Sequence, residues 1–287
     1  MSLIVKNFFE NVNIGGNATK ISEEISQRLL QSGLQPGSNV PLAAYLLYKV
    51  AQTNSNSDVT IQDIFEGRLD ISEGTRYFAK EQLPEEAWAQ ILPMVNNYTA
   101  EEFALAALLP EHEDEMKLAM ATPHTILTLV HHLLDVQPDE YVGDLCCGSG
   151  SGFVSFAMNQ PEAHYFGYEI NEERGGIARI RAELLGSNVQ VRLGDVFRLA
   201  DDKNTPRFDK MFSNYPFGMR LRYLGEGSDY MERLAEQYPG LSKATSSDWI
   251  FNALLCDLLA ESGKAIGIMT NGSTWNSIDT PMRGYFV

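Results

Sequence analysis

The sequence predicts an α/β region with a parallel sheet over residues 116–287, preceded by an all-helical region over residues 1–110. In the first region, helical patterns follow one another with no glycine-rich turn between a strand and a helix. From about Met116, strand-like and helical stretches alternate, which is typical of a parallel sheet with helices on both faces. Between them, Glu111–Glu115 holds four acidic side chains and indicates a solvated linker.

In the helical region, apolar periodicity and capping residues predict six helices. They cover Thr19–Leu30, Pro41–Ala51, Thr60–Phe65, Ser72–Leu83, Pro84–Asn96 and Thr99–Leu109. Thr99 and Glu102 have the spacing of a capping box before an apolar run. We find no metal-ligand cluster and no nucleophile–base pair in this part of the sequence, and we interpret it as a small interaction or lid domain.

The second region is predicted to open with a helix in which Thr122 is the N-cap and Pro123 the first helical residue. Strands are then predicted at Tyr141–Leu145, Ala163–Glu169, Val189–Leu193, Phe208–Ser213 and Lys264–Thr270. Helices are predicted at Gly152–Asn159, Asn171–Leu185 and Asp248–Glu261, the last ending at Gly263. Met219–Ser247 is interpreted as either a lid over the site or a solvated insertion.

Polar residues follow four of the predicted strands. Ligands of parallel α/β sheets bind beyond the carboxyl ends of the strands, where the strand order reverses. Asp144 is followed by the turn Gly148–Gly152, which suits a nucleotide because glycines allow close backbone approach and a helix begins there. Glu169 follows the glycine turn at about the separation along the sequence that is expected for an acid that binds ribose hydroxyls. Asp195 and Asn214–Gly218 end the next two strands; each acid also has the simpler interpretation of a helix cap.

Composition excludes several classes of protein. A net charge of −16 and an isoelectric point of about 4.7 argue against a freestanding nucleic-acid binder, which needs a basic surface. Cys146, Cys147 and Cys256 have no metal-ligand spacing, and we interpret them as small buried hydrophobic residues in a reducing cytoplasm. No apolar run is long enough to span a membrane. No metal site is predicted.

The residues after the fourth strand narrow the choice of cofactor. The glycine turn lacks the GxGxxG spacing of dinucleotide-binding proteins, which argues against a nicotinamide enzyme. Asn214-Tyr215-Pro216-Phe217 suits methyl transfer to a planar nitrogen. An amide oxygen and the next backbone carbonyl accept the two hydrogens of an exocyclic amine, while an aromatic ring stacks on the base.

At these residues the sequence resembles the N6-adenine DNA methyltransferases, especially the modification subunit of type I restriction systems. Asp144–Gly150 is similar to the family's Asp-Pro-Ala-Cys-Gly-Thr-Gly, and Asn214–Phe217 to its catalytic Asn-Pro-Pro-Phe. Ala121–His124 resembles the Tyr-Thr-Pro-Arg that contacts the methionine part of the cofactor. Gly167–Asn171 looks like the Gly-x-Glu-Ile-Asn segment that binds ribose, and Gly194–Asp195 like the acidic segment near adenine. Met269–Gly272 is similar to the Pro-Asn-Gly after the fifth strand.

The resemblance implies a Rossmann-like class I S-adenosylmethionine-dependent methyltransferase fold. It implies that S-adenosylmethionine is held by residues of these motifs, namely Thr122, Pro123, Asp144, Cys146, Gly148, Ser149, Gly150, Glu169, Ile170, Asp195, Val196 and Asn214. It implies catalysis by Asn214, Tyr215, Pro216 and Phe217, in which Tyr215 supplies a backbone carbonyl. The side chain at 215 is therefore expected to matter far less than that at 214, and Tyr215→Pro is expected to preserve or raise activity.

The sequence departs from the family in three ways, and these departures and the net charge lead to the remaining expectations. Tyr215 and Leu145 each stand where the family has proline. The family continues with further strands past Val287, so the chain is expected to be truncated at its C-terminus. The acidic charge favours a division of labour in which a separate specificity subunit provides most contacts with DNA, with a restriction subunit as a possible further partner. The alternatives are a methyltransferase for RNA or protein glutamine, and a catalytically impaired cofactor-binding partner protein.

Overall fold

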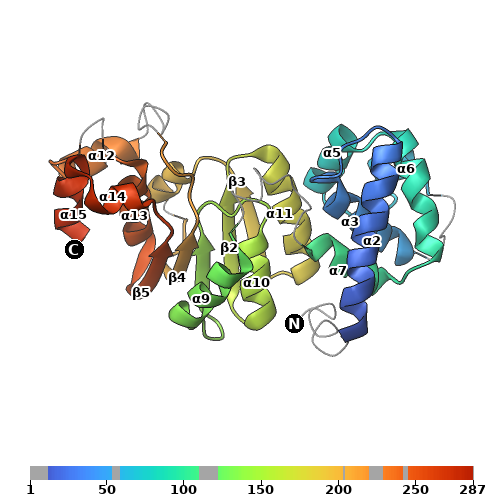
Figure 1. Cartoon of the computed structure of the whole chain (residues 1–287), viewed down its shortest axis with the longest axis horizontal. Coiled ribbons are helices and arrows are strands. Elements are labelled where there is room, and N and C mark those ends of the chain that lie inside the picture. The colour runs from blue at the N-terminus through green and yellow to red at the C-terminus, as the bar shows by residue number, and fades with distance from the viewer. Residues whose placement is uncertain are drawn as a thin grey trace.

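The computed structural model describes residues 12–53, 59–109, 122–202, 204–219, 229–241 and 245–286. The predicted linker Glu111–Glu115 lies outside these ranges. The division of the chain into domains at residues 110 and 116 therefore stays a prediction. Figure 1 shows the helices of the first part on one side of the sheet of the second part.

All six predicted helical stretches of the first region are helical in the structure. The elements are α2 (Val12–Gln31), α3 (Asn39–Ala51), α4 (Ile61–Phe65), α5 (Glu73–Gln82), α6 (Glu85–Ile91), the 3-10 helix η1 (Leu92–Asn96) and α7 (Ala100–Leu108). The stretch predicted as one helix over Pro84–Asn96 changes to a 3-10 helix where Pro93 removes a backbone donor. The predicted capping box is confirmed, since Thr99 and Glu102 bond each other's backbone amides.

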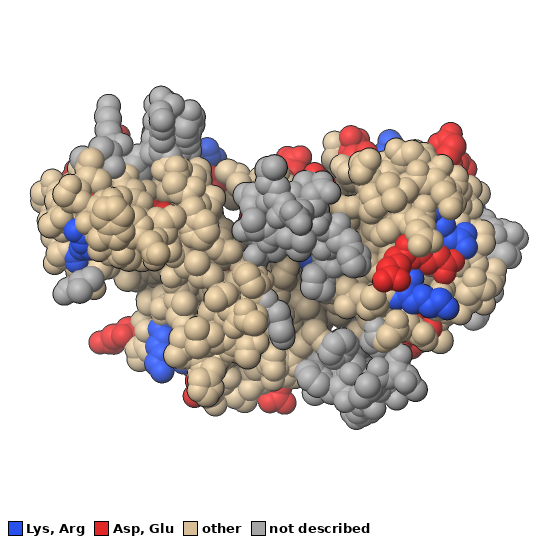
Figure 2. Space-filling model, viewed as in Figure 1, with Lys and Arg blue, Asp and Glu red and all other residues tan. Residues whose placement is uncertain are grey.

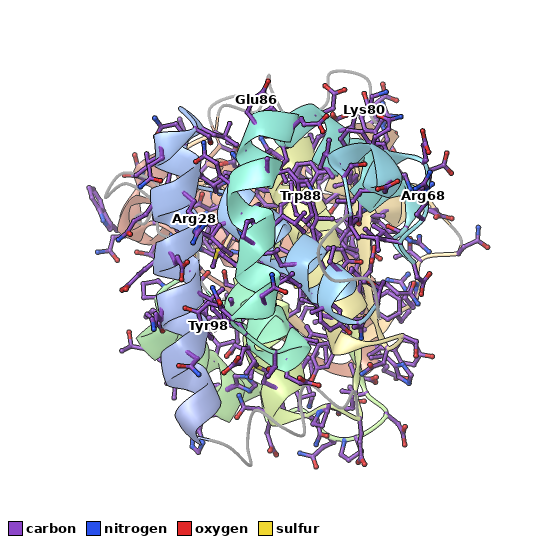
Figure 3. The ribbon with its side chains drawn as sticks, turned by 90° about the vertical axis from the view of Figure 1, so that its right-hand side faces the viewer. Arg28, Arg68, Lys80, Glu86, Trp88 and Tyr98 are labelled. Carbon is purple, nitrogen blue, oxygen red and sulfur yellow. The ribbon has the colours of Figure 1, made fainter. Side chains whose placement is uncertain are left out.

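Side chains on α2 and α6 join the helices of this region to one another (Figure 3). Arg28 donates to the Gln90 carbonyl at 2.7 Å and forms an ion pair with Glu24 one turn earlier. Trp88 is buried, and its indole nitrogen donates to the Val59 carbonyl at 2.9 Å. Arg28 thus links α2 to α6, and Trp88 links α6 to the segment before α4.

The second region contains the predicted parallel sheet. Its strands are β1 (Tyr141–Asp144), β2 (His164–Glu169), β3 (Val189–Leu193), β4 (Phe208–Ser213) and β5 (Leu259–Gly267), in the order β3-β2-β1-β4-β5 with every pair parallel. The chain moves outward from β1 through β2 to β3 and then returns to the other side of β1. The strand order therefore reverses between β1 and β4, which is where the fold places a ligand.

Helices cover both faces of the sheet. On one face lie α9 (His124–Leu134), α10 (Ser151–Asn159) and α11 (Glu172–Leu185), which share an apolar core with the helical region. The 3-10 helix η2 (Val196–Asp201), α12 (Asp229–Gln237) and α13 (Ser247–Leu258) share a second core on the other face. Neighbouring residues of β4 contribute to different cores: Met211 packs in the second core and Phe212 in the first. The prediction of an α/β fold is confirmed.

The region around Gly263 is where the predicted elements were wrong. The helix predicted to run to Glu261 ends at Leu258, and β5 begins at Leu259 rather than at Lys264. A Cβ atom on Gly263 would lie 2.8 Å from the Phe208 carbonyl oxygen of β4. Glycine is thus required by close approach of the neighbouring strand and does not end a helix. After β5 come α14 (Asn271–Trp275), η4 (Ser277–Asp279) and α15 (Thr280–Phe286).

Candidate active site

The reversal of strand order brings two turns to the same edge of the sheet. Asp144, the last residue of β1, is in register with Phe212 of β4, so the segment that begins at Asn214 leaves the sheet beside the glycine turn. On the other side of β1, the Cys147 amide donates to the Tyr168 carbonyl of β2 at 2.9 Å. The ends of β1, β2 and β4 therefore form one continuous surface.

The glycine turn has a backbone conformation and an open side that suit a ligand. Gly148 and Gly150 have φ angles of +58° and +91°, which a side chain would strain. A Cβ atom on Gly150 would lie 2.3 Å from the ring of Phe153, so glycine is also needed there for space. Apart from Gly148 itself and its two chain neighbours, no heavy atom of the described residues lies within 4 Å of the position that a Gly148 Cβ would take, so these residues leave that side of the turn open to close approach.

Glu169, the predicted ribose acid, also supports the glycine turn. Its Oε2 accepts a hydrogen bond from the Gly148 amide at 2.9 Å, and its Oε1 accepts one from the Asn171 amide at 2.8 Å. The residue is 8% exposed. Each oxygen keeps a second lone pair, so the carboxylate can hold the turn and still accept a hydrogen bond from a hydroxyl.

Asp144 is buried directly beneath the same turn. Its Oδ1 accepts from the Cys146 amide at 3.3 Å, and its Oδ2 lies 2.9 Å from where a Cβ atom on Gly152 would sit. Burial raises the pKa of Asp144 to about 7, the Cys146 amide opposes that rise, and the charge of Glu169 adds to it. Two carboxylates close together make this a favourable place for a cation.

The prediction of buried cysteines is confirmed for Cys147, while Cys146 is partly buried and Cys256 is not buried. Cys147 is buried, with its Sγ 2.9 Å from the position of a Gly167 Cβ, and burial raises the pKa of both the Cys146 and Cys147 thiols. A raised thiol pKa makes a poor nucleophile. Cys256 on α13 is exposed, so its assignment to an apolar interior was wrong.

Thr122 does not cap the helix that follows it, and that prediction was wrong. The N-cap of α9 is Pro123, and no side chain caps the helix. The Thr122 hydroxyl instead accepts a hydrogen bond from Nδ2 of Asn214 at 3.0 Å. This bond uses the amide nitrogen of Asn214. The Asn214 Oδ1, which is the atom that can accept a hydrogen bond from an amine, does not take part in it.

The side chain of Tyr215 packs in the protein interior. The sequence predicted a role for its backbone carbonyl only. Its ring stacks on Phe251 of α13 with centroids 4.8 Å apart and planes 7° from parallel. Its hydroxyl donates to the Asn252 Oδ1 at 3.1 Å, and the residue is 1% exposed. Burial raises the pKa of this phenol. Phe251 and Asn252 are thus functional candidates that sequence reasoning missed, since only the packing of the segment after β4 against α13 reveals them.

The remaining predicted residues lie around these two turns. Phe217 is 48% exposed and Pro216 is exposed, so the turn Asn214–Phe217 presents an apolar surface. Asp195 caps η2 by accepting from the Phe197 amide at 3.0 Å, which is the simpler interpretation foreseen for it. Of the other two residues predicted to bind the cofactor, Val196 is buried and Ile170 is exposed.

Searches for two other kinds of feature found none within the described ranges. No group of three or more histidine, cysteine, aspartate or glutamate residues is placed to hold a metal ion there. Similarly, none of the described helices combines the length and the apolar character needed to cross a membrane.

Comparison with known proteins agrees with this geometry. A model of the N-6 DNA Methylase family matches residues 102–281. The methylase subunit of the type I restriction enzyme MjaVIII from Methanocaldococcus jannaschii is 27% identical over 153 residues, which cover 47% of this chain and 25% of that protein. The chain thus matches about a quarter of the length of this curated relative.

Two solved structures share the fold. One is described as a modification subunit of a type I restriction enzyme from Vibrio vulnificus; it has a TM-score of 0.65 at 14% identity, and the match covers 95% of this chain and 75% of that one. The other is described as a class I S-adenosylmethionine-dependent methyltransferase from Listeria monocytogenes, with a TM-score of 0.52 at 16% identity over 85% and 78% of the two chains.

Proposed function

Because the chain belongs to the N-6 DNA methylase family, we propose that it transfers a methyl group from S-adenosylmethionine to N6 of adenine in DNA, as the modification subunit of a restriction-modification system. The observation that carries the proposal is the pair of turns at the reversal of strand order. One has the open glycine backbone and carboxylates of a nucleotide site, and the other presents an oriented amide and an exposed aromatic ring.

The residues of the first turn fit S-adenosylmethionine. The open side of Gly148 admits a ligand against the backbone, and Glu169 has acceptor capacity for ribose hydroxyls. A cationic cofactor bound beside Asp144 would favour the ionised form of this buried carboxyl, whose pKa burial raises to about 7. When bound, S-adenosylmethionine supplies an activated methyl group. We also assign Asp195, just beyond the end of β3, to this cofactor site.

The second turn fits a planar amine. The Asn214 Oδ1 and the Tyr215 carbonyl accept the two hydrogens of the amine and hold its lone pair toward the methyl donor. Thr122 fixes which end of the Asn214 amide faces the base by accepting from Nδ2. Phe217 stacks on the ring of an adenine that has left the duplex, since the target nitrogen cannot be reached inside the base stack. In-line positioning provides much of the acceleration.

Charge supports a partner for DNA binding. On the face shown in Figure 2, the Lys and Arg residues of the described ranges form small separate groups beside Asp and Glu, without a continuous basic stripe. The whole chain carries a net charge of −16. We propose that a basic specificity subunit holds the duplex, and we expect the chain alone to bind duplex DNA weakly at physiological salt. Tight binding by the isolated chain with a steep salt dependence would contradict this division of labour.

The proposal is tested by offering labelled S-adenosylmethionine with DNA, RNA and protein in parallel, with and without the candidate partner subunit. We expect label on DNA, recovered as N6-methyladenine after digestion. Label on RNA or on glutamine amides instead of DNA would show that the site methylates a different planar nitrogen. Cofactor binding without transfer to any of the three would indicate a cofactor-binding partner protein rather than an enzyme.

A further inference from the structure

Helix α11 lies between the sheet and the helical region (Figure 1). Two adjacent glycines make this possible. A Cβ atom on Gly175 would lie 2.0 Å from a side-chain methyl of Leu193 in β3, and one on Gly176 would lie 2.9 Å from the ring of Phe78 in α5. The helix is therefore packed closely on both sides, and the apolar core that includes it continues into α2, α3 and α7.

Arg181 of α11 is fully buried in this junction. Its Nε donates to the Ala107 carbonyl at 3.2 Å, and one terminal nitrogen donates to the Leu109 carbonyl. These carbonyls lie at the end of α7, where a helix leaves its last acceptors without internal partners. Its other terminal nitrogen donates to the Ser149 carbonyl at 2.8 Å. One guanidinium thus joins the end of α7 to the glycine turn.

The hydrogen bond from Arg181 to the turn lies close to the hydrogen bond between the turn and Glu169. The Glu169 carboxylate accepts from the Gly148 amide, and the Arg181 guanidinium donates to the carbonyl of the next residue. The peptide groups 147–148 and 149–150 of the turn, with one peptide group between them, are therefore each fixed by a charged side chain, and the two side chains have opposite sign. Charge-assisted hydrogen bonds of this kind are roughly twice as strong as neutral ones.

We infer that Arg181 is a positioning residue that couples the helical region to the cofactor-binding turn. Docking of α7 holds the guanidinium where it fixes the Ser149 carbonyl, and a ligand that requires the turn in this conformation strengthens the docking of α7 in return. The helical region in this sense contributes to the cofactor site through Arg181. The inference rests on the proposed function, because it places S-adenosylmethionine on this turn.

The junction also offers a matched control. Glu183, half a turn further along α11, accepts hydrogen bonds from Thr75 Oγ1 at 2.9 Å and from the hydroxyl of Tyr45. These bonds dock the helical region on α11 without reaching the glycine turn. Glu183→Ala therefore weakens the junction alone, whereas a change at Arg181 weakens both the junction and the turn.

The experiment compares Arg181→Lys, Arg181→Met and Glu183→Ala in the full chain, with S-adenosylhomocysteine as the probe. We expect calorimetry to show affinity falling about 10–100-fold for Arg181→Met, since loss of a charge-assisted bond corresponds to such a factor. Arg181→Lys should recover part of it, because lysine keeps the charge but not the three-way geometry. Glu183→Ala should lower the melting temperature and leave the affinity within about twofold of wild type.

Hydrogen exchange of the ligand-free protein separates this inference from the cofactor assignment. The Gly150 amide, which bonds the Cys147 carbonyl at 2.8 Å, reports on the turn without any ligand. Its exchange should be faster in Arg181→Lys, which is mild enough to fold, and unchanged in Glu183→Ala. Equal exchange in wild type and Arg181→Lys would overturn the coupling. If exchange responds as expected but wild type binds no S-adenosylhomocysteine, the coupling stands and the cofactor assignment fails.

Discussion

The glycine turn and the proposed catalytic turn, Asn214–Phe217, lie at the same edge of the sheet but are held in different ways. The glycine turn is fixed through its backbone: Glu169 and Arg181 bond its peptide groups, and its own glycines provide the conformation. The catalytic turn is fixed through its side chains, since Tyr215 is anchored on α13 and Asn214 on Thr122. The glycine turn therefore requires residues without a side chain at Gly148 and Gly150. The catalytic turn instead requires the side chains of Asn214 and Tyr215.

Asn214→Ala is expected to have the largest effect. Methyl transfer should fall by about 10³-fold or more, because a preorganised acceptor is lost where charge develops. Affinity for S-adenosylhomocysteine should stay within a few fold of wild type, since the two turns are held independently. Asn204→Ala, at an exposed position away from both turns, is the control. Wild-type transfer by Asn214→Ala in the presence of the partner subunit would show that this turn is not the active site.

Tyr215→Pro tests whether the catalytic turn depends on the packing of the Tyr215 side chain against α13. The structure predicts a loss of activity, whereas the sequence alone predicts that activity is preserved or raised. Proline restores the family's fixed φ but removes a buried ring and its hydroxyl bond, so the free energy of unfolding should fall by about 3–5 kcal/mol and transfer should fall with it. Tyr215→Phe keeps the ring stacked on Phe251 and should lose only about 1 kcal/mol. Denaturant unfolding with parallel transfer assays measures both. Undiminished activity in Tyr215→Pro would mean that the backbone alone shapes this turn.

Glu169→Ala tests the glycine turn in the same way. The change removes an acceptor for ribose and the bond to the Gly148 amide, so cofactor affinity should fall by about 1–3 kcal/mol, with less effect on the rate at saturating cofactor. Glu172→Ala, at an exposed position in the first turn of α11, provides the control. Calorimetry with S-adenosylhomocysteine is the measurement. A loss confined to the maximal rate would place Glu169 with the catalytic turn instead.

The same difference explains what the sequence could predict. The glycine turn was predicted in detail because its determinants are local: glycines at fixed spacing after a strand, with an acid at the end of the next strand. Its support from Arg181 was not, because a buried arginine inside a helix looks like a surface residue in a sequence. The role of Tyr215 escaped for a related reason, since stacking on Phe251 joins elements that only the fold brings together. Thr122 was misread because a Thr-Pro pair favours a helix start, and a tertiary contact with Asn214 overrode that local preference.

Thr122→Val is expected to have the smallest effect, and it distinguishes two roles for one hydroxyl. If Thr122 orients the Asn214 amide, loss of its acceptor should lower the maximal rate about fivefold to tenfold, the equivalent of one neutral hydrogen bond. The cofactor affinity should not change, and Thr122→Ser should restore the rate because serine keeps the hydroxyl. If Thr122 instead contacts the methionine part of the cofactor, as the family resemblance implies, Thr122→Val should weaken cofactor binding and leave the saturated rate intact. Single-turnover kinetics over a range of S-adenosylmethionine concentrations separates the two, and the first outcome would assign Thr122 to the catalytic turn that its side chain helps to hold.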